Sequence, residues 1–323
     1  MIDSDILELL AALMSAPSAT HLHAEERVEN DVARWLVEHE SSLCAVLRDQ
    51  PKLLEQLGSA ADRHQSQDAR FRLNTRSADG RRGALVVIEG IDGSGKGTQA
   101  ELLHASAKRE GVQLDRLSFP RYGQTVFSLL IAQYLNGKFG TIDTVPARCS
   151  ALLFAGDRFE SRALLEAMIG DTDLVVLDRY VASNVAYHAA RVARHQQASF
   201  RDWLYGLEYG AFGMPLPDQH IFLDVPADLA TRWVLLKAPR SYTDAAADIH
   251  ERRADYMQRC REMFLELSVD ATFGPWQRID CLDSATGKPL PVSVVAEMAW
   301  SIARSARSFP PLLSRVEPLV RSH

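Results

Sequence analysis

The sequence predicts an α/β protein with a parallel sheet, preceded by a small helical extension, and three observations support this fold class. Short apolar runs of strand length alternate with longer segments of helical periodicity, which is typical of parallel strands joined by helical crossovers. The chain of 323 residues is 46% hydrophobic and 24% charged, as expected for a globular protein. A glycine-rich stretch follows the first apolar run and leads into a helical pattern.

The N-terminal part is expected to form an acidic helical extension. Its apolar residues recur at three- and four-residue spacing, Pro51 suits a first helical turn, and Gly58 suits a helix end. The polar segment 59–82 is typical of a linker. We therefore place a domain boundary near residue 80, with the extension at 1–80 and the main domain at 81–323.

Five apolar runs of the main domain are predicted to be strands buried on both faces. They are ALVVIE (84–89), QLDRLSF (113–119), DLVVLD (173–178), HIFLDV (220–225) and WQRIDCL (276–282). The segment TQAELLHASAKREG supplies a helix after the first strand, and this helix should end at Gly111. The segment 235–251 interrupts two helical patterns and is predicted to be a lid.

The charge distribution argues against two classes of partner. The chain has 42 acidic and 36 basic residues, and residues 1–80 hold 14 of the acidic and 8 of the basic ones. The remaining 28 acidic and 28 basic residues balance, so the main domain is neutral. Binding to nucleic acid or to an anionic membrane needs a basic surface. Neither partner is expected.

Apolar content and cysteine spacing indicate a cytoplasmic location. The apolar runs are shorter than the roughly 20 residues that a transmembrane helix needs, and the start of the chain lacks a basic signal-peptide region. The four cysteines show no CxxC spacing, which favours reduced structural thiols over a zinc site or a disulfide framework.

The glycine-rich stretch is predicted to bind phosphate. Residues 90–96 fit the pattern GxxxxGK, with a strand before and a helix after. In such a loop, backbone N–H groups surround phosphate oxygens and the lysine neutralises the group that is transferred. The nucleotide contacts are assigned to Gly90, Ile91, Asp92, Gly93, Ser94, Gly95, Lys96, Gly97 and Thr98.

Gly97 departs from the usual loop, in which Ser or Thr after the lysine gives Mg²⁺ a hydroxyl ligand. The metal would then depend on water, carboxylates and phosphates, which Mg²⁺ accepts readily. Asp178 ends a predicted strand and is placed to hold the waters of Mg²⁺, while Arg179 offers a planar fork for a phosphate. An ordinary ion pair is the alternative interpretation of these two residues.

Five motifs in order resemble thymidylate kinase over about residues 83–305: EGIDGSGKGT, FPRYGQ, LFAGDR, LDRYVASNVAY and DIHE. The resemblance implies a P-loop nucleoside monophosphate kinase fold, with a five-stranded parallel sheet ordered 2-3-1-4-5, helices on both faces, a short lid and a homodimer. It also implies Mg-assisted in-line transfer of the γ-phosphoryl group of ATP to the 5′-phosphate of dTMP, giving dTDP and ADP.

The resemblance also implies which residues bind the acceptor. They are Asp92, Phe119, Pro120, Tyr122, Phe154, Arg158, Arg179, Asn184, Tyr187, Asp248 and Glu251. Among them, Phe154 would stack on thymine, Arg158 would hydrogen-bond its carbonyl, and Tyr187 would favour deoxyribose by crowding the 2′ position. Taken without the resemblance, Phe154 on a helix is more typical of a core residue.

The catalytic and metal contacts come from the same resemblance. The catalytic set is Lys96, Asp92, Arg179, Lys237 and Arg240, and the metal set is Asp178, Asp92 and Glu251. Because Gly93 stands where some family members have arginine, the lid is the better source of a transition-state cation; a solvated charged turn is the alternative. Gly156 and His250 depart mildly from the family pattern.

Two other functions remain open from the sequence. One is a kinase for another nucleoside monophosphate, or a polyphosphate-dependent nucleotide kinase, which would share a loop with glycine after the lysine. The other is a nucleotide-binding regulator without catalysis, with the extension as its interaction module.

Overall fold

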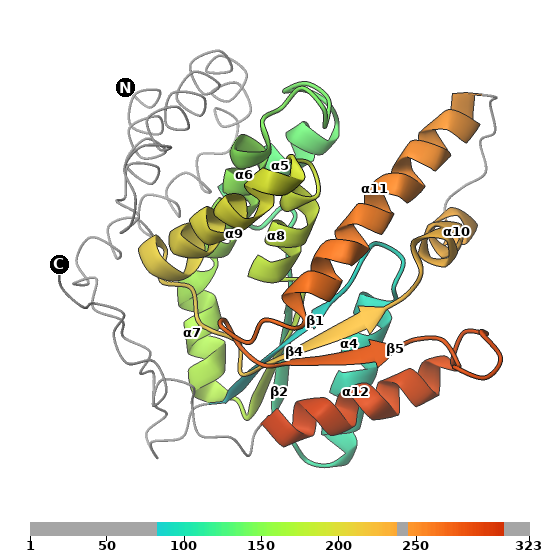
Figure 1. Cartoon of the computed structure of the whole chain (residues 1–323). Coiled ribbons are helices and arrows are strands. Elements are labelled where there is room, and N and C mark those ends of the chain that lie inside the picture. The colour runs from blue at the N-terminus through green and yellow to red at the C-terminus, as the bar shows by residue number, and fades with distance from the viewer. Residues whose placement is uncertain (1–82, 238–244, 307–323) are drawn as a thin grey trace. The chain divides into compact units, whose positions relative to one another are not determined.

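The computed structural model describes residues 83–237 and 245–306, and between residues 235 and 253 it describes the backbone only. The predicted extension at 1–80 lies outside the described residues. The strands are β1 (Ala84–Glu89), β2 (Leu114–Ser118), β3 (Leu174–Asp178), β4 (Gln219–Asp224) and β5 (Trp276–Asp280) (Figure 1).

The α-helices between these strands are α4 (Lys96–Arg109), α5 (Val126–Leu135), α6 (Ala147–Glu160), α7 (Arg162–Asp171), α8 (Val181–Ala189), α9 (Gln197–Tyr205), α10 (Ala227–Lys237), α11 (Ala245–Leu267) and α12 (Val292–Ala306). A short 3₁₀ turn, η1 (Arg194–Gln196), precedes α9, and a π-helix, η2 (Gly206–Ala211), follows it. None of the described helices has both the length and the apolar character needed to cross a membrane.

The described chain divides into two compact units. We call the first the sheet unit: it holds all five strands and comprises the described residues of 83–118, 166–186 and 216–306. The second, the helical unit, comprises residues 119–165 and 187–215 and contains α5, α6, α9 and η2.

The sheet is entirely parallel, in the order β2-β3-β1-β4-β5, which confirms the predicted fold class and strand order. Each strand lies within two residues of its predicted bounds. Burial on both faces is confirmed for β1 and β4 but is wrong for β2 and β5, which expose several side chains. These two strands form the sheet edges, so each has a neighbour on one side only.

The end of α4 shows why Gly111 was a reliable signal. Gly111 has a φ of 68°, in the left-handed region that glycine adopts without steric cost. The N–H of Val112 donates to the carbonyl of Ala107 at 2.9 Å, and the N–H of Gly111 donates to Lys108 at 3.4 Å. This Schellman arrangement satisfies the last carbonyls of α4 and ends the helix at the predicted place.

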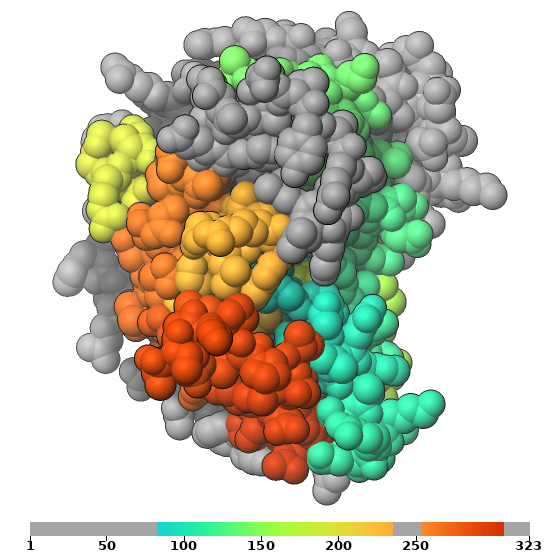
Figure 2. All heavy atoms as spheres, turned by 90° about the vertical axis from the view of Figure 1, so that its right-hand side faces the viewer, coloured from blue at the N-terminus to red at the C-terminus, as the bar shows by residue number. Residues whose placement is uncertain are grey.

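Helices cover both faces of the sheet. Figure 1 shows α4 and α12 side by side along one face and α11 along the other. Phe222 of β4 stacks on Phe264 of α11 with ring centroids 5.4 Å apart, and both rings are fully buried. Figure 2 shows the face of this unit where α10 (gold), the segment after β5 (red) and α4 (teal) reach the surface.

Two helices pack closely in the helical unit, and a glycine makes this possible. Thr125 begins α5 by accepting a hydrogen bond from the N–H of Ser128 at 3.0 Å, and Ser128 returns a contact to the N–H of Thr125. The buried ring of Phe127 then lies so close to α6 that a Cβ added to Gly156 would be 2.4 Å from a ring carbon. Gly156, a mild departure in the sequence, is therefore a packing requirement here.

Gly156→Ala tests this packing. Although alanine is the better helix former, the extra methyl must displace Phe127, so we expect the free energy of unfolding to fall by about 1–3 kcal/mol. Gly170→Ala in α7 is the matched control, because an added Cβ there meets nothing within 4 Å. The control should gain up to about 1 kcal/mol from helix propensity. Equal effects of the two changes on urea unfolding would contradict the packing argument.

Candidate active site

The phosphate loop connects β1 to α4 through a tight turn in the sheet unit. Gly90, Gly93 and Gly95 have φ values of 149°, 86° and 90°, which side chains rarely adopt. A Cβ added to Gly93 would lie 2.3 Å from the carbonyl oxygen of Ala230 in α10. The loop is therefore pressed against α10, and no side chain can be accommodated at position 93.

Lys96 is held over this loop. Its side chain is buried, and Nζ donates a hydrogen bond to the carbonyl of Ile91 at 2.8 Å. Burial is the main cause that lowers the pKa of Lys96 to about 8, and the charge of Arg179 lowers it in the same direction. Since this value stays above neutral pH, the ammonium group remains mostly charged and can neutralise phosphate.

Arg179 is turned toward the same loop. It directly follows β3, its φ of 69° lies in the left-handed region, and its N–H donates to the carbonyl of Ile88 at 3.1 Å. Such a conformation is costly for a residue with a Cβ and is commonly found at functional sites. Its guanidinium forms an ion pair with Asp92 of the loop. The structure thus brings together three of the predicted catalytic residues.

Glu89 supports this arrangement, and the sequence analysis assigned it no role. Its fully buried carboxylate accepts hydrogen bonds from the N–H groups of Tyr180 at 3.0 Å and Ser183 at 3.2 Å, and from the Ser183 hydroxyl. Burial raises the pKa of Glu89 to about 7. The available signal was a single acidic residue at the end of an otherwise apolar strand.

Asp178 lies beside the start of α4 and has an unsatisfied oxygen. Among the described residues, its buried Oδ1 has no hydrogen-bond partner. A Cβ added to Gly97 would lie 3.3 Å from the other oxygen, Oδ2, so the glycine after Lys96 leaves room for this carboxylate. A carboxylate with an unused oxygen beside a phosphate loop is suited to hold a cation or its water shell.

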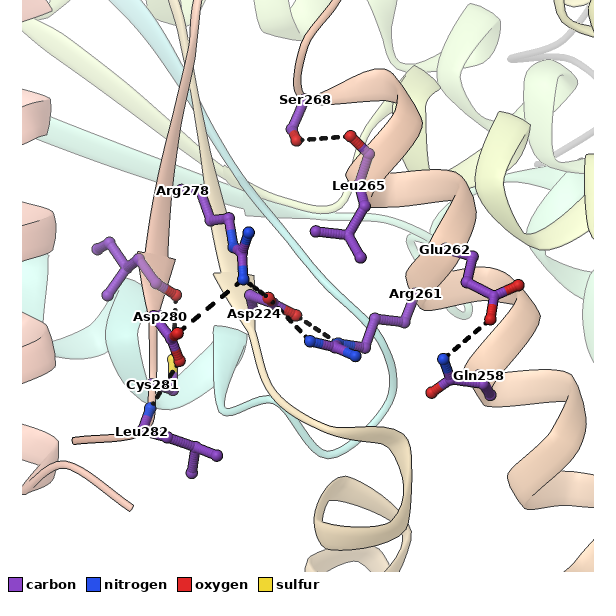
Figure 3. Close-up of polar contacts among 11 residues, drawn as sticks. Asp224, Gln258, Arg261, Glu262, Leu265, Ser268, Arg278, Asp280, Cys281 and Leu282 are labelled. Atoms are coloured by element: carbon purple, nitrogen blue, oxygen red, sulfur yellow. Dashed lines mark hydrogen bonds and ion pairs between the residues drawn. The ribbon is translucent and has the colours of Figure 1, made fainter. Parts of the chain in front are cut away.

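A charged network lies at the carboxyl ends of β4 and β5 (Figure 3). The fully buried carboxylate of Asp224 accepts two hydrogen bonds from Arg261 of α11, at 2.6 and 3.1 Å, and pairs with Arg278 of β5 at 2.6 Å. The hydrogen bonds to Asp224 raise the pKa of Arg261. Asp280 lies 3.9 Å from Arg278. The network fixes α11, which follows the predicted lid, to the sheet.

In the helical unit, Asp157 organises the segment that precedes α5. Its carboxylate accepts hydrogen bonds from the N–H of Arg121 at 3.0 Å and from the Thr125 hydroxyl. The guanidinium of Arg121 donates to the Ser161 hydroxyl at 3.1 Å. The motif FPRYGQ is therefore held by α6. Sequence analysis quoted the motif LFAGDR but gave its aspartate no role.

Two predicted base-contact residues, Phe154 and Arg158, and the predicted sugar contact Tyr187 lie in the same unit. Phe154, half-buried on α6, makes an edge contact with the ring of His188 at a centroid distance of 5.4 Å. Arg158 lies one helical turn later, on the same face of α6. It is buried and forms two hydrogen bonds with Glu208, at 2.5 and 2.7 Å. Tyr187 is half-buried.

The predicted residues thus fall into two groups. Those in the sheet unit are the loop residues 90–98, Asp178, Arg179 and Asn184, and those in the helical unit are Phe119, Pro120, Tyr122, Phe154, Arg158 and Tyr187. Asn184 and Phe119 are buried, whereas 55% of Tyr122 is exposed. The side chains of Lys237, Arg240, Asp248, His250 and Glu251 lie outside the described part. Within that part, no group of three or more histidine, cysteine, aspartate or glutamate side chains forms a metal cluster.

Comparisons with known proteins identify relatives of this chain. A sequence model of the thymidylate kinase family matches residues 88–278. Thymidylate kinase of Mycobacterium tuberculosis H37Rv is 36% identical over 192 residues, which cover 59% of this chain and 89% of that protein. Human thymidylate kinase is 29% identical over 222 residues, 68% of this chain and 92% of that protein.

A solved structure of thymidylate kinase from Candida albicans has a similar fold. Its TM-score is 0.50 at 24% sequence identity, and the match covers 69% of this chain and 92% of that one. At this level of identity the likeness concerns the fold alone.

Glu160 should make the stability of the fold depend on pH. It lies three residues after Asp157 on α6, and one carboxyl oxygen accepts from the N–H of Phe127 at 3.3 Å. The other oxygen is buried without a hydrogen-bond partner among the described residues. Burial is the main cause that raises the pKa of Glu160 to about 8, and the charge of Asp157 adds to the shift.

The raised pKa of Glu160 predicts that the free energy of unfolding falls as the pH rises from about 4.5 to about 8. As the pH rises above 4.5, the ordinary value, the unfolded chain releases this proton while the folded chain keeps it until about pH 8. Over that window this group should cost about 1.4 kcal/mol of unfolding free energy per pH unit. Glu160→Gln should remove this slope in urea unfolding. The control Glu101→Gln removes the charge of a side chain that is 71% exposed and should leave the slope unchanged. A slope that persists in Glu160→Gln would refute the assignment to Glu160.

Proposed function

This chain belongs to the thymidylate kinase family, and from that premise we propose that it transfers the γ-phosphoryl group of ATP to the 5′-phosphate of dTMP, giving dTDP and ADP. It is thus a nucleoside monophosphate kinase. One observation carries the proposal beyond family membership: the convergence of Lys96, Asp92 and Arg179 at the phosphate loop. Two cations and one carboxylate meet there, beside backbone N–H groups at the start of a helix.

The donor site is assigned to the loop residues 90–98. Their N–H groups and the N-terminal end of α4 favour the phosphates of ATP, and Lys96 would neutralise the group in transfer. Direct in-line transfer needs little beyond positioning and charge neutralisation. The side chain of Asp92 already fixes Arg179 through their ion pair, so the fork is oriented before a phosphate arrives.

Mg²⁺ is the cofactor that we propose beside ATP. Asp178 fits this group because it has a buried oxygen without a hydrogen-bond partner among the described residues, and Gly97 leaves space beside it. Asp92 and Glu251 are further candidates from the family resemblance. When bound, Mg²⁺ would offset the charge that develops on the phosphates. One carboxylate plus water and phosphates is an ordinary donor set for this ion.

The acceptor contacts are proposed from the family resemblance. Phe154 and Arg158 are proposed to recognise thymine by stacking and by a hydrogen bond to its carbonyl. Asn184 would add a second base contact, and Tyr187 would favour deoxyribose. The remaining acceptor contacts are proposed for Phe119, Pro120, Tyr122, Arg179, Asp248 and Glu251. Paired polar contacts of this kind discriminate bases far better than an apolar slot does.

Further proposals concern the lid, assembly and location. Lys237 and Arg240 are proposed to supply lid cations, because α10 leaves no room for a side chain at Gly93. A homodimer is proposed from the family resemblance. Cys149, Cys260 and Cys281 are buried thiols without disulfide bonds, which supports a reducing compartment such as the cytoplasm.

The proposed reaction is tested by measuring diphosphate formation from dTMP, dUMP, AMP, CMP and GMP, each offered separately with ATP and Mg²⁺, and with polyphosphate as an alternative donor. We expect a strong preference for dTMP and ATP. Lys96→Ala should lower turnover by about 10³-fold or more while the protein stays folded, since Lys96 neutralises the transferred group. A preference for another acceptor would indicate a kinase for a different nucleoside monophosphate. Tight binding of dTMP without turnover would indicate a nucleotide-binding regulator.

Asp178→Asn tests the metal assignment. Because the amide carries no charge, the Mg²⁺ concentration that gives half-maximal rate should rise about tenfold or more. The KM for dTMP should change little, as Asp178 is not assigned to the base. Asp115→Asn, on the exposed edge strand β2, is the control. Parallel losses at all Mg²⁺ concentrations, with no change in the metal requirement, would assign Asp178 another role.

A further inference from the structure

A buried ion pair in the helical unit has no role in the function described so far. Nε and Nη2 of Arg158 donate to the two carboxylate oxygens of Glu208, at 2.5 and 2.7 Å. The side chains expose 3% and 0% of their surface. Both oxygens of Glu208 are thus bound to one edge of the guanidinium plane. This two-point contact fixes the plane as well as the position of Arg158.

Glu208 comes from an unusual element that is itself fastened to its surroundings. It lies in the π-helix η2, whose wide turn is shown by the hydrogen bond from the N–H of Phe212 to the carbonyl of Leu207 at 2.8 Å. Phe159 of α6 packs on Phe212 with ring centroids 4.9 Å apart, and Arg162 donates to the Phe212 carbonyl at 3.0 Å. π-Helical turns are rare and frequently occur at functional sites.

Stability alone is a poor explanation for this pair. Removing two charges from water costs several kcal/mol per ion, and well-packed apolar residues are often as stable as a buried pair. What the pair does provide is orientation. The fork uses two of the five N–H donors of Arg158 and so fixes the plane and the direction of its guanidinium group.

The fixed fork has a consequence for base recognition. Arginine donates hydrogen bonds and cannot accept them, so it suits the carbonyl at position 4 of thymine and opposes the amino group at that position of cytosine. Glu208 is an acceptor that could bind such an amino group. Both its oxygens accept from Arg158, so its side chain is directed to the arginine, and none of its surface is exposed. The pair therefore sets the direction of a group that donates to a carbonyl and does not accept from an amino group.

We propose that Glu208 is a positioning residue that sets the base selectivity of the acceptor site by locking the guanidinium of Arg158. The inference rests on the proposed function, since it assumes that Arg158 meets the pyrimidine carbonyl of dTMP. It adds a residue to which neither the sequence nor the family resemblance assigned a role, and it gives the π-helix a part in choosing the substrate.

Glu208→Gln tests the inference. The amide keeps the size of the side chain but has one acceptor oxygen in place of two, so Arg158 loses the two-point contact that fixes its guanidinium plane. We expect the KM for dTMP to rise about tenfold, and the ratio of kcat/KM for dTMP over dCMP to fall about tenfold. The KM for ATP should stay within about twofold. Asp202→Asn, on α9 with 69% of its side chain exposed, is the control and should change none of these values.

A second variant allows for the destabilisation that an unpaired buried arginine would cause. Glu208→Asp keeps the charge and shortens the side chain by one methylene, so it should fold and give a smaller change in the same direction. If the variant that folds keeps the wild-type KM for dTMP and the wild-type base ratio, the inference is overturned. Failure of both variants to fold would mean that the pair serves folding, which also overturns it.

The wild-type protein in the same assay distinguishes a failure of the positioning role of Glu208 from a failure of the proposed function. If it phosphorylates dTMP while the Glu208 variants keep its selectivity, the positioning role alone fails. If the wild type prefers another acceptor, the proposed function fails, and the positioning role falls with it.

Discussion

The buried carboxylate of Glu89 is the constraint on which the phosphate-binding end of the sheet unit depends. It takes hydrogen bonds from two N–H groups and a hydroxyl at the start of α8, and so ties the end of β1 to the turn that follows β3. Because Arg179 lies within that turn in a strained conformation, the same contacts hold its guanidinium toward the loop. Burying this carboxyl is costly, as its pKa near 7 shows. Burial of Glu89 therefore lowers the stability of the fold but fixes the positions of the charged groups around it.

Buried carboxylates also hold neighbouring groups in place in the helical unit. Asp157 holds the backbone before α5, and Glu208 holds the guanidinium of Arg158. In each case a buried carboxylate fixes a group that is assigned to ligand binding. In the sheet unit, Asp224 holds α11 through Arg261 and the neighbouring strand β5 through Arg278. Buried carboxylates thus hold in place the groups to which we assign binding roles.

The sequence predicted those features that depend on neighbouring residues. Apolar runs located the five strands, Gly111 located the end of α4, and the GxxxxGK pattern located the phosphate loop. The supporting contacts could not be predicted, because their partners are far apart in the chain: Glu89 and Ser183 are 94 residues apart, and Arg158 and Glu208 are 50 apart. Edge exposure was also missed, although the sequence carried a signal for it. The edge strands β2 (LDRLS) and β5 (WQRID) contain polar and charged residues in mid-strand, whereas β1 (ALVVIE) and β3 (LVVLD) are apolar up to their last residue.

The contact between Gly93 and α10 also limits how this enzyme can change over evolutionary time. A substitution that put a cation in the loop would place its Cβ against the Ala230 carbonyl, and a backbone atom cannot be moved aside by a rotamer change. Such a substitution would be accepted only after α10 had shifted, so two changes at distant positions would be needed, each unfavourable without the other. Packing against α10 therefore limits which residues can occupy position 93 of the loop.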